Sequence, residues 1–186
     1  MTRGAQRILE VRASDDVLVE RIRGGDERAF FALYSRYARF VAGIAYRLIG
    51  DNSEVDDVVQ DTFIALDRGI HKLQDPSKVK SWLAIVATRV VRKRLGKRSR
   101  RRWLSRQAEE MVPMRSNPND QDRVELLYQA LEKLSPRVRV PWAMHRIEGA
   151  TLPETAERCG VSLATVKRRI SSAAEKLRKQ LGEEWV

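Results

Sequence analysis

Apolar residues recur every three or four positions along most of the chain, without the strict alternation of apolar and polar residues that marks strands. This spacing is typical of amphipathic helices. It predicts a short helix over residues 15–23, ended by Gly24 and Gly25. A long helix is predicted to begin after Asp26 and to end at Gly50. Its apolar face consists of Phe30, Leu33, Tyr34, Tyr37, Val41, Ile44, Ala45 and Leu48. The pattern predicts an all-α protein.

The next predicted helix has two different faces. Ser53, with Asp56 three residues later, is typical of a helix start. One face carries the apolar residues Val55, Val58, Val59, Phe63 and Leu66. The other carries the carboxylates Glu54, Asp57 and Asp61. We expect this helix to pack on its apolar side and to present its carboxylates to a partner.

A loop over residues 69–80 precedes a helix that starts near Lys80. The residues expected to face the core are Trp82, Leu83, Val86, Val90 and Val91, and those expected to face outward are Arg89, Arg92 and Lys93. The helix leads into the basic run Lys97–Arg102, which we expect to be too irregular to read bases and to anchor phosphates instead.

The chain is expected to form two small helical domains. Residues 104–122 contain prolines and asparagines with poor periodicity, which predicts a flexible linker. The linker separates a domain over residues 15–103 from a domain over residues 123–186. The first 14 residues form an N-terminal tail to which we assign no role.

The second domain has the pattern of a helix-turn-helix. Thr151 and Glu154 form a capping box, Gly160 is placed to turn the chain, and Ser162 is placed to cap a helix that runs to Leu181. In such a domain the start of the last helix lies in the major groove, where Lys and Arg donate to guanine. A three-helix unit whose turn happens to contain glycine would show the same pattern.

Charge is distributed unevenly along the chain. The net charge is +11, yet residues 51–67 hold six acids and no base, and residues 76–108 hold twelve bases and no acid. Two opposite blocks favour two partners, one basic and one polyanionic. Solvated helix faces next to a basic linker would also explain these charges.

Several kinds of chemistry are not supported. The single Cys159 excludes an internal disulfide and a multi-cysteine metal site. His71 and His145 are too few for a catalytic triad or a zinc site, and no second acidic cluster accompanies Asp56, Asp57 and Asp61 to hold a metal. We expect no enzyme, no cofactor and no metal.

The chain has no apolar segment typical of a secretory signal and no run of the roughly 20 apolar residues that a membrane helix needs. We expect a cytoplasmic protein with no membrane partner. Cys159, Trp82 and Trp142 are expected to pack in the interior. Trp103 lies among arginines, where it either stacks on a base or closes the domain.

Both halves of the chain together resemble the extracytoplasmic-function (ECF) sigma factors of bacterial RNA polymerase. The segments that carry the resemblance are Gly25–Phe30, Leu33–Tyr37, Val55–Phe63, Trp82–Ala87, Leu131–Pro136, Gly149–Gly160 and Thr165–Lys167. The run Asp-Val-Val-Gln-Asp-Thr-Phe followed by Trp-Leu is specific to that family.

The resemblance implies three sets of functional residues. It implies polymerase binding by Glu54, Asp57, Gln60, Asp61 and Phe63. It implies contact with the −10 element, which the family melts, by Lys72, Lys78, Lys80, Trp82, Thr88, Arg89 and Arg92. It implies reading of the −35 element by Ser162, Ala164, Thr165, Lys167, Arg168, Ser171 and Ser172. The implied partners are core RNA polymerase, promoter DNA and an anti-sigma factor.

Two other functions remain open. A stand-alone helix-turn-helix regulator would bind duplex DNA without polymerase, although it would have no use for the acidic helix. An adaptor protein would use the basic block to bind RNA. Thr88 and Ala164 replace the asparagine and glycine that are usual in the family, which leaves the promoter sequence undetermined.

Overall fold

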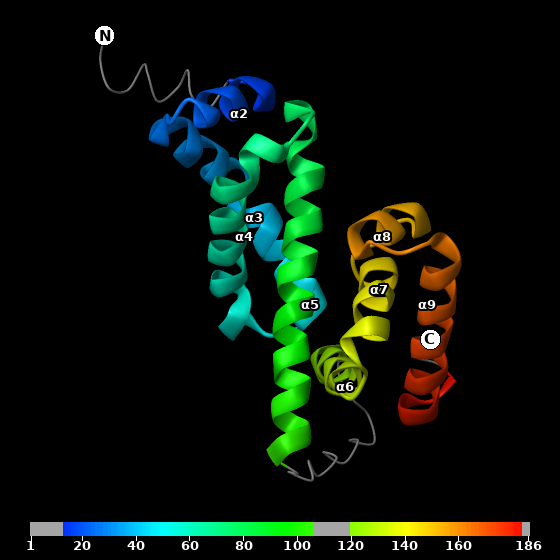
Figure 1. Ribbon diagram of the computed structural model, residues 1–186. Helices are drawn as coiled ribbons and strands as arrows, with labels where there is room; N and C mark the ends of the chain where they lie inside the picture. Colours follow the sequence, from blue (N-terminus) through cyan, green and yellow to red (C-terminus); the bar gives the residue numbers. More distant parts are fainter. Residues whose placement is uncertain (1–12, 106–119, 184–186) are drawn as a thin grey trace. The chain divides into compact units, whose positions relative to one another are not determined.

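The computed structural model describes residues 13–105 and 120–183, and this part of the chain is helical without any strand (Figure 1). The predicted all-α fold is confirmed. The chain divides into two compact units, Met1–Tyr46 with Asp51–Val90, and Arg47–Gly50 with Val91–Val186.

The first unit contains α2 (Asp15–Arg23), most of α3 (Glu27–Ile49), α4 (Val55–Gly69) and the beginning of α5 (Val79–Ser105). Short 3₁₀ turns lie at Asn52–Glu54, Ile70–Lys72 and Pro76–Lys78. The fully buried side chains of this unit include Leu18, Val19, Leu33, Ile44, Leu66, Ile70 and Leu83. They come from every helix of the unit, so the core holds the four helices together.

The turn between α2 and α3 follows the predicted capping. Gly25 has a φ of 83°, which favours glycine. The carboxylate of Asp26 accepts hydrogen bonds from the backbone amides of Arg28 and Ala29, at 3.0 and 3.3 Å. Asp26 therefore caps α3, and the prediction that the long helix begins after this residue is confirmed.

The expectation of an irregular Lys97–Arg102 run is wrong, because α5 continues as one helix to Ser105. Lys, Arg and Leu are good helix formers, and repulsion between the arginines is relieved by a single carboxylate. Arg98 and Arg102 both form ion pairs with Glu132, at 3.6 and 3.1 Å. The predicted linker therefore begins inside a helix, and its residues 106–119 lie outside the described part of the chain.

The second unit is completed by α6 (Asp120–Glu132), α7 (Pro136–Arg146), α8 (Leu152–Cys159) and α9 (Leu163–Leu181). Its interior contains the buried side chains of Leu131, Val140, Trp142, Met144, Val166 and Leu177. The predicted burial of Trp142 is confirmed. The beginning of α6 at Asp120 places a further part of the predicted linker in a helix.

The turn between α8 and α9 has the predicted helix-turn-helix geometry. Gly160 adopts a left-handed conformation with a φ of 65°, and the amide of Val161 donates to the carbonyl of Ala156 at 3.1 Å. The hydroxyl of Ser162 then accepts a hydrogen bond from the amide of Thr165 at 3.3 Å and caps α9. Local caps thus fix where the last helix begins.

The end of α3 belongs to the second unit through specific polar contacts. Tyr128 donates its hydroxyl to the carbonyl of Arg47 at 3.0 Å, and the guanidinium of Arg139 donates to the carbonyl of Ile49 at 2.7 Å. Arg139 is 2% exposed, and burial lowers its pKa to about 10, so it stays protonated at neutral pH. Gly50 has a φ of 76°, and a Cβ there would lie 2.0 Å from the ring of Tyr128.

Cys159 is 4% exposed and packs against Met144, with 3.8 Å between the two sulfur atoms. Its predicted burial is confirmed. Desolvation raises the pKa of the thiol above its ordinary value, which keeps it in the unreactive protonated form at neutral pH. The side chain therefore fills the interior of the second unit.

Replacing Thr151 with alanine should destabilise the protein by about 1 kcal/mol. Its hydroxyl accepts from the amide of Glu154 at 3.3 Å, while the Glu154 carboxylate accepts from the amide of Thr151 at 2.8 Å. Urea denaturation followed by circular dichroism measures the change. Thr151→Ser keeps the capping oxygen and should stay within about 0.5 kcal/mol of the wild type. An equal loss in both variants would contradict the capping role.

Cys159 should react with a soluble disulfide reagent about 100-fold more slowly in the native protein than in urea at the same pH. Both its burial and its raised pKa act in that direction. Absorbance of the released thiolate measures the two rates. Comparable rates would show that the thiol is accessible in the folded state.

Candidate functional site

An aromatic groove of about 950 Å³ lies between α3 and α4 in the first unit. Three large apolar side chains that line it are exposed to solvent, namely Phe31 at 66%, Ile64 at 41% and Tyr34 at 38%. Sequence reasoning did not assign a functional role to these residues. Phe31 follows Phe30 directly, so helical spacing could have shown that only one of the two faces the core.

Phe63 forms the floor of this aromatic groove rather than its exposed surface. It is 3% exposed, and its ring centroid lies 4.7 Å from that of Tyr34 and 6.3 Å from that of Phe30. The Phe30–Phe63 pair is edge-on, at 82°. Phe63 therefore supports the exposed aromatic residues, while Gln60 lines the groove from α4 and is exposed.

Acidic side chains border the aromatic groove. Glu27, Asp56 and Asp67 line it and are exposed. Asp26 also lines the groove and forms an ion pair with Arg21 at 2.7 Å. The hydrogen bond from Arg21 holds the pKa of the Asp26 carboxyl below its ordinary value. Among the described residues, the border therefore consists of four carboxylates and one exposed cation, Arg68 of α4.

The predicted carboxylate stripe does not line the groove itself. Asp57 and Asp61 are exposed on α4, one position after the groove-lining Asp56 and Gln60. Glu54 is half-buried in the 3₁₀ turn that precedes α4. We use the term groove surface for the aromatic groove with its acidic border and the adjoining Asp57 and Asp61.

The segment between α4 and α5, together with the first turn of α5, places three of the predicted cations at the surface. Lys72, Lys78 and Lys80 are exposed, and Lys78 lies 3.5 Å from the carboxylate of Asp75. The ammonium group of Lys80 lies 5.2 Å from the ring centroid of Phe40, which is the distance of a cation–π contact. The segment thus presents positive charge next to the start of α5.

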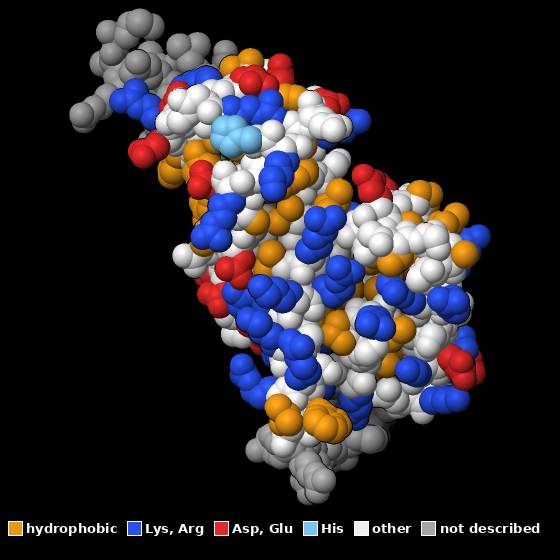
Figure 2. All heavy atoms as spheres, in the orientation of Figure 1, with side chains coloured by type: hydrophobic (Ala, Val, Ile, Leu, Met, Phe, Trp, Pro, Cys, Tyr) orange, Lys and Arg blue, Asp and Glu red, His pale blue; other side chains and the backbone are white. Residues whose placement is uncertain are grey.

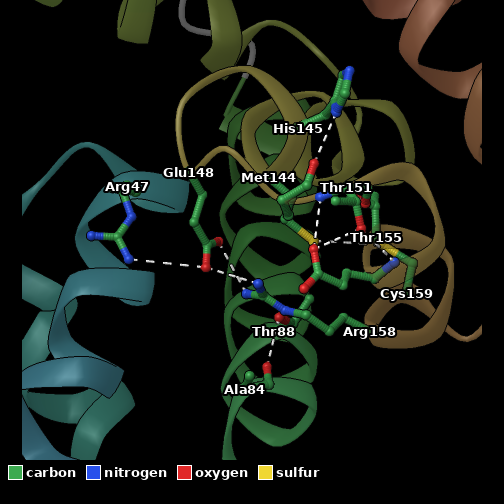
Figure 3. A network of polar contacts seen from close by, with 12 residues as sticks. Arg47, Ala84, Thr88, Met144, His145, Glu148, Thr151, Thr155, Arg158 and Cys159 are labelled. Carbon is green, nitrogen blue, oxygen red and sulfur yellow. Dashed lines mark hydrogen bonds and ion pairs between the residues drawn. The ribbon is translucent and has the colours of Figure 1, made fainter. Parts of the chain in front are cut away.

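Two residues of the predicted −10 set lie deeper in the unit. Thr88 is 1% exposed and its hydroxyl donates to the carbonyl of Ala84 at 2.8 Å (Figure 3). The Thr88 side chain is therefore hydrogen-bonded within α5 rather than exposed to solvent. Trp82 is half-buried over Gly69, where an added Cβ would lie 3.1 Å from the indole.

The cations of α5 fall into two groups. Arg92, Arg94, Arg98 and Arg102 are half-buried, and Arg92 donates to the carbonyl of Cys159 at 3.0 Å within the second unit. The exposed group consists of Arg89, Lys93, Lys97, Arg100 and Arg101. In Figure 2, Lys and Arg side chains gather along the course of α5. Exposed positive charge therefore follows the length of this helix.

The start of α9 presents most of the predicted −35 residues to solvent. The exposed residues are Ser162, Ala164, Lys167, Arg168 and Ser171, whereas Thr165 and Ser172 are half-buried. The hydroxyls of Ser162 and Thr165 lie 3.0 Å apart and also serve the helix cap. Lys167 and Arg168 form no ion pair within the described residues, so both can donate to a nucleic acid.

A largely buried ion pair joins α8 to the turn that precedes it. Arg158 donates to both carboxylate oxygens of Glu148 at 2.8 and 3.0 Å, and the two side chains are 11% and 9% exposed (Figure 3). The Nδ1 atom of His145 forms a hydrogen bond with the carbonyl oxygen of Ala150 at 2.9 Å. Sequence reasoning missed this pair, because its partners are ten residues apart and joined by a turn that no pattern predicts.

No group of three or more His, Cys, Asp or Glu side chains could hold a metal ion within residues 13–105 and 120–183. Across the same residues, none of the helices is long and apolar enough to cross a membrane. The described residues thus form two kinds of charged surface. One is the acidic and aromatic groove surface of α3 and α4, and the other consists of the exposed cations of α5 and α9.

Two family models match this chain. Residues 33–101 match Sigma-70 region 2, and residues 124–177 match Sigma-70 region 4. The ECF RNA polymerase sigma-E factor of Haemophilus influenzae is 26% identical over 181 residues, covering 90% of this chain and 95% of that protein. The RNA polymerase sigma factor CarQ of Myxococcus xanthus is 28% identical over 168 residues, covering 89% and 96%.

Solved structures give the same result. CnrH in complex with the cytosolic domain of CnrY is similar with a TM-score of 0.59 and 26% identity, covering 91% of this chain and 97% of CnrH. RpoE of Bartonella quintana, solved with the anti-sigma factor NepR, shares the fold with a TM-score of 0.58 at 21% identity, covering 83% and 98%. Both halves of the chain thus match one kind of protein over nearly its whole length, and the chain belongs to the sigma-70 family of RNA polymerase sigma factors, in its ECF group.

Proposed function

We propose that this sigma factor binds core RNA polymerase through the groove surface, contacts the −10 element through residues 72–92 and reads the −35 element with the start of α9. Members of the family direct RNA polymerase to promoters, and that role fits the two oppositely charged surfaces. The observation that carries the polymerase assignment is the groove surface, because a protein that bound only DNA would have no use for it.

The groove surface suits a basic amphipathic partner. Phe31, Tyr34 and Ile64 offer exposed apolar contacts on adjacent helices, and apolar anchors of this kind supply most of the affinity of protein interfaces. The acidic border attracts a positively charged partner and suppresses acidic ones. Helix-in-groove binding combines these two features, with apolar anchors in the groove and cations at its edges.

The −10 contacts are assigned to exposed cations and one half-buried indole. Lys72, Lys78, Lys80 and Arg89 are placed to track the backbone of separated strands. Trp82 lies at the same end of α5 and supplies an aromatic face. Thr88 is left out of this set because it is buried, and Arg92 enters it only when its bond to Cys159 is broken.

The −35 contacts are assigned to the exposed start of α9. Lys167 and Arg168 lie one turn beyond the Ser162 cap, where side chains of a recognition helix reach base edges. The buried Glu148–Arg158 pair fixes α8 and so limits how the recognition helix can shift.

The domain boundaries proposed from the sequence, residues 15–103 and 123–186 with a tail and a linker, are retained for the fragments that bind polymerase and DNA. We assign the protein to the cytoplasm, where polymerase and promoters are found, and we assign no catalysis to it. CnrH and RpoE were each solved with a partner, the CnrY cytosolic domain and the anti-sigma factor NepR. An anti-sigma factor is therefore proposed as a third partner of this chain.

Replacing Asp57 and Asp61 together with lysine should abolish capture of core RNA polymerase. The double change reverses the charge beside the groove, whereas exposed charges contribute little to stability. Pull-down with purified core polymerase in the absence of DNA measures the effect.

The matched control replaces Glu125 and Glu157, which are exposed in the second unit, with lysine. It changes net charge equally and should leave capture unchanged. Circular dichroism confirms folding of both double variants. Retained capture by a folded Asp57/Asp61 variant would overturn the assignment, and loss in both would show a nonspecific charge effect.

Replacing Arg168 with alanine should relax preference at one or two −35 positions and cost about 1–3 kcal/mol on the preferred promoter. Replacing Arg100 and Arg101 with alanine should weaken all promoters alike and reduce the salt dependence by about one unit for each phosphate that is no longer bound. Arg102 is left unchanged because it pairs with Glu132.

Transcription from a small −35 library at two salt concentrations separates the two effects. The assignment fails if the Arg100/Arg101 variant reorders the promoters while the Arg168 variant keeps their order. Such a result would place base reading on α5 and anchoring on α9.

A further inference from the structure

The aromatic groove between α3 and α4 combines exposed apolar surface with negative charge that has no counterpart nearby. Within the described part of the chain, Phe31 and Ile64 remain exposed at the groove. Three carboxylates of its border form no ion pair within residues 13–105 and 120–183, namely those of Glu27, Asp56 and Asp67. An occupant that fits this groove therefore needs apolar side chains flanked by cations.

Residues 1–12 of the same chain have this composition. They lie outside the described residues, and we call them the tail segment. The segment contains one acid, Glu10, and three arginines, Arg3, Arg7 and Arg12. Two large apolar residues, Ile8 and Leu9, follow the second arginine directly. The tail segment thus supplies both the cations and the apolar side chains that the groove calls for.

The tail segment begins at a point that is fixed on α3. The guanidinium of Arg36 donates to the carbonyl of Ala13 at 2.6 Å and to the carboxylate of Asp15 at 2.6 Å. Tyr37 donates its hydroxyl to the same carboxylate. These contacts hold the first described residues of the chain against the helix that forms one wall of the groove.

The groove lies within reach of this anchor. Arg36 comes five residues after the groove-lining Phe31, which places it about 7.5 Å along α3 and about 140° around the axis. On a helix about 10–12 Å across, the path between them over the surface is about 15 Å. Ser35, which lies on that path, is exposed. Five residues of extended chain span up to about 17 Å, so Ile8 can reach the groove from Ala13.

We propose that the tail segment occupies the aromatic groove of its own chain. Ile8 and Leu9 pack against the exposed apolar side chains of the groove. The guanidinium groups of Arg3 and Arg7 lie beside the unpaired carboxylates of the border. The consequence for polymerase rests on the proposed function, because a tail segment in the groove must leave before polymerase can bind there.

Attachment to the same chain makes weak contacts sufficient. A short flexible connection holds its end at an effective concentration on the order of 1 mM. A tail segment that binds the groove with a Kd of about 0.1 mM is then docked in about nine of ten molecules. Docking at this level weakens the apparent affinity of any other ligand of the groove by about tenfold.

Disulfide trapping in the full-length chain tests the docking without polymerase. The groove pair combines Gln6→Cys with Gln60→Cys, because Gln60 lines the groove and is exposed. The control pair combines Gln6→Cys with Gln74→Cys, which alters an exposed glutamine of the same unit away from the groove. With oxidised glutathione, the intramolecular disulfide should form at least about tenfold faster in the groove pair. Mass spectrometry of tryptic peptides measures both rates, and the buried Cys159 does not compete.

Substitutions in the tail segment separate specific docking from chance collision. Ile8→Ser together with Leu9→Ser removes the apolar contacts at constant net charge, and should lower the trapping rate of the groove pair to that of the control pair. Val11→Ser alters the stretch between anchor and groove and should change the rate less than twofold. In the chain without added cysteines, the Ile8/Leu9 variant should bind core polymerase about tenfold more tightly, measured by biolayer interferometry.

Equal trapping rates in the groove pair and the control pair would overturn the proposal. A disulfide that joins two molecules, at a rate that rises with protein concentration, would also overturn it, because the segment would then occupy the groove of a second copy. Fast trapping in the groove pair with no gain in polymerase affinity for the Ile8/Leu9 variant would support the docking. That combination would contradict the polymerase assignment of the groove instead.

Discussion

The repulsion among twelve positive charges between residues 76 and 108 is the constraint on which the arrangement of this protein depends. The chain keeps most of these charges on one continuous helix, α5, by dividing them between two faces. Glu132 neutralises part of the repulsion by binding Arg98 and Arg102. The remaining cations stay exposed along α5, where they can contact a polyanion.

In the first unit, large apolar side chains are exposed to solvent while the core stays packed. Phe63 is buried and supports Tyr34 and Phe30 from below, so that the exposed residues of the groove rest on a packed layer. Acidic residues border the groove and favour a basic partner over self-association. The proposed function uses this groove surface for polymerase and the exposed cations of α5 and α9 for DNA.

Local signals in the sequence predicted the helix starts well. Asp26, Thr151 and Ser162 cap α3, α8 and α9 as expected, because a cap depends only on residues within one turn. The helical state of Lys97–Arg102 was not predicted, and the ion pairs of Arg98 and Arg102 with Glu132, about 30 residues away, could not be seen in a local pattern. Phe31 was missed as a groove residue although its spacing from Phe30 carried the signal, and the 1% exposure of Thr88 depends on packing that a family position does not reveal.

The central claim is that this chain directs core RNA polymerase to two-part promoters. Run-off transcription with purified core polymerase on fragments of the source genome tests it most directly. The account predicts discrete transcripts whose start sites share one sequence near −10 and another near −35, and that appear only when this protein is added. Duplex DNA binding by the protein alone, with no transcript above the background of core polymerase on any fragment, would contradict it.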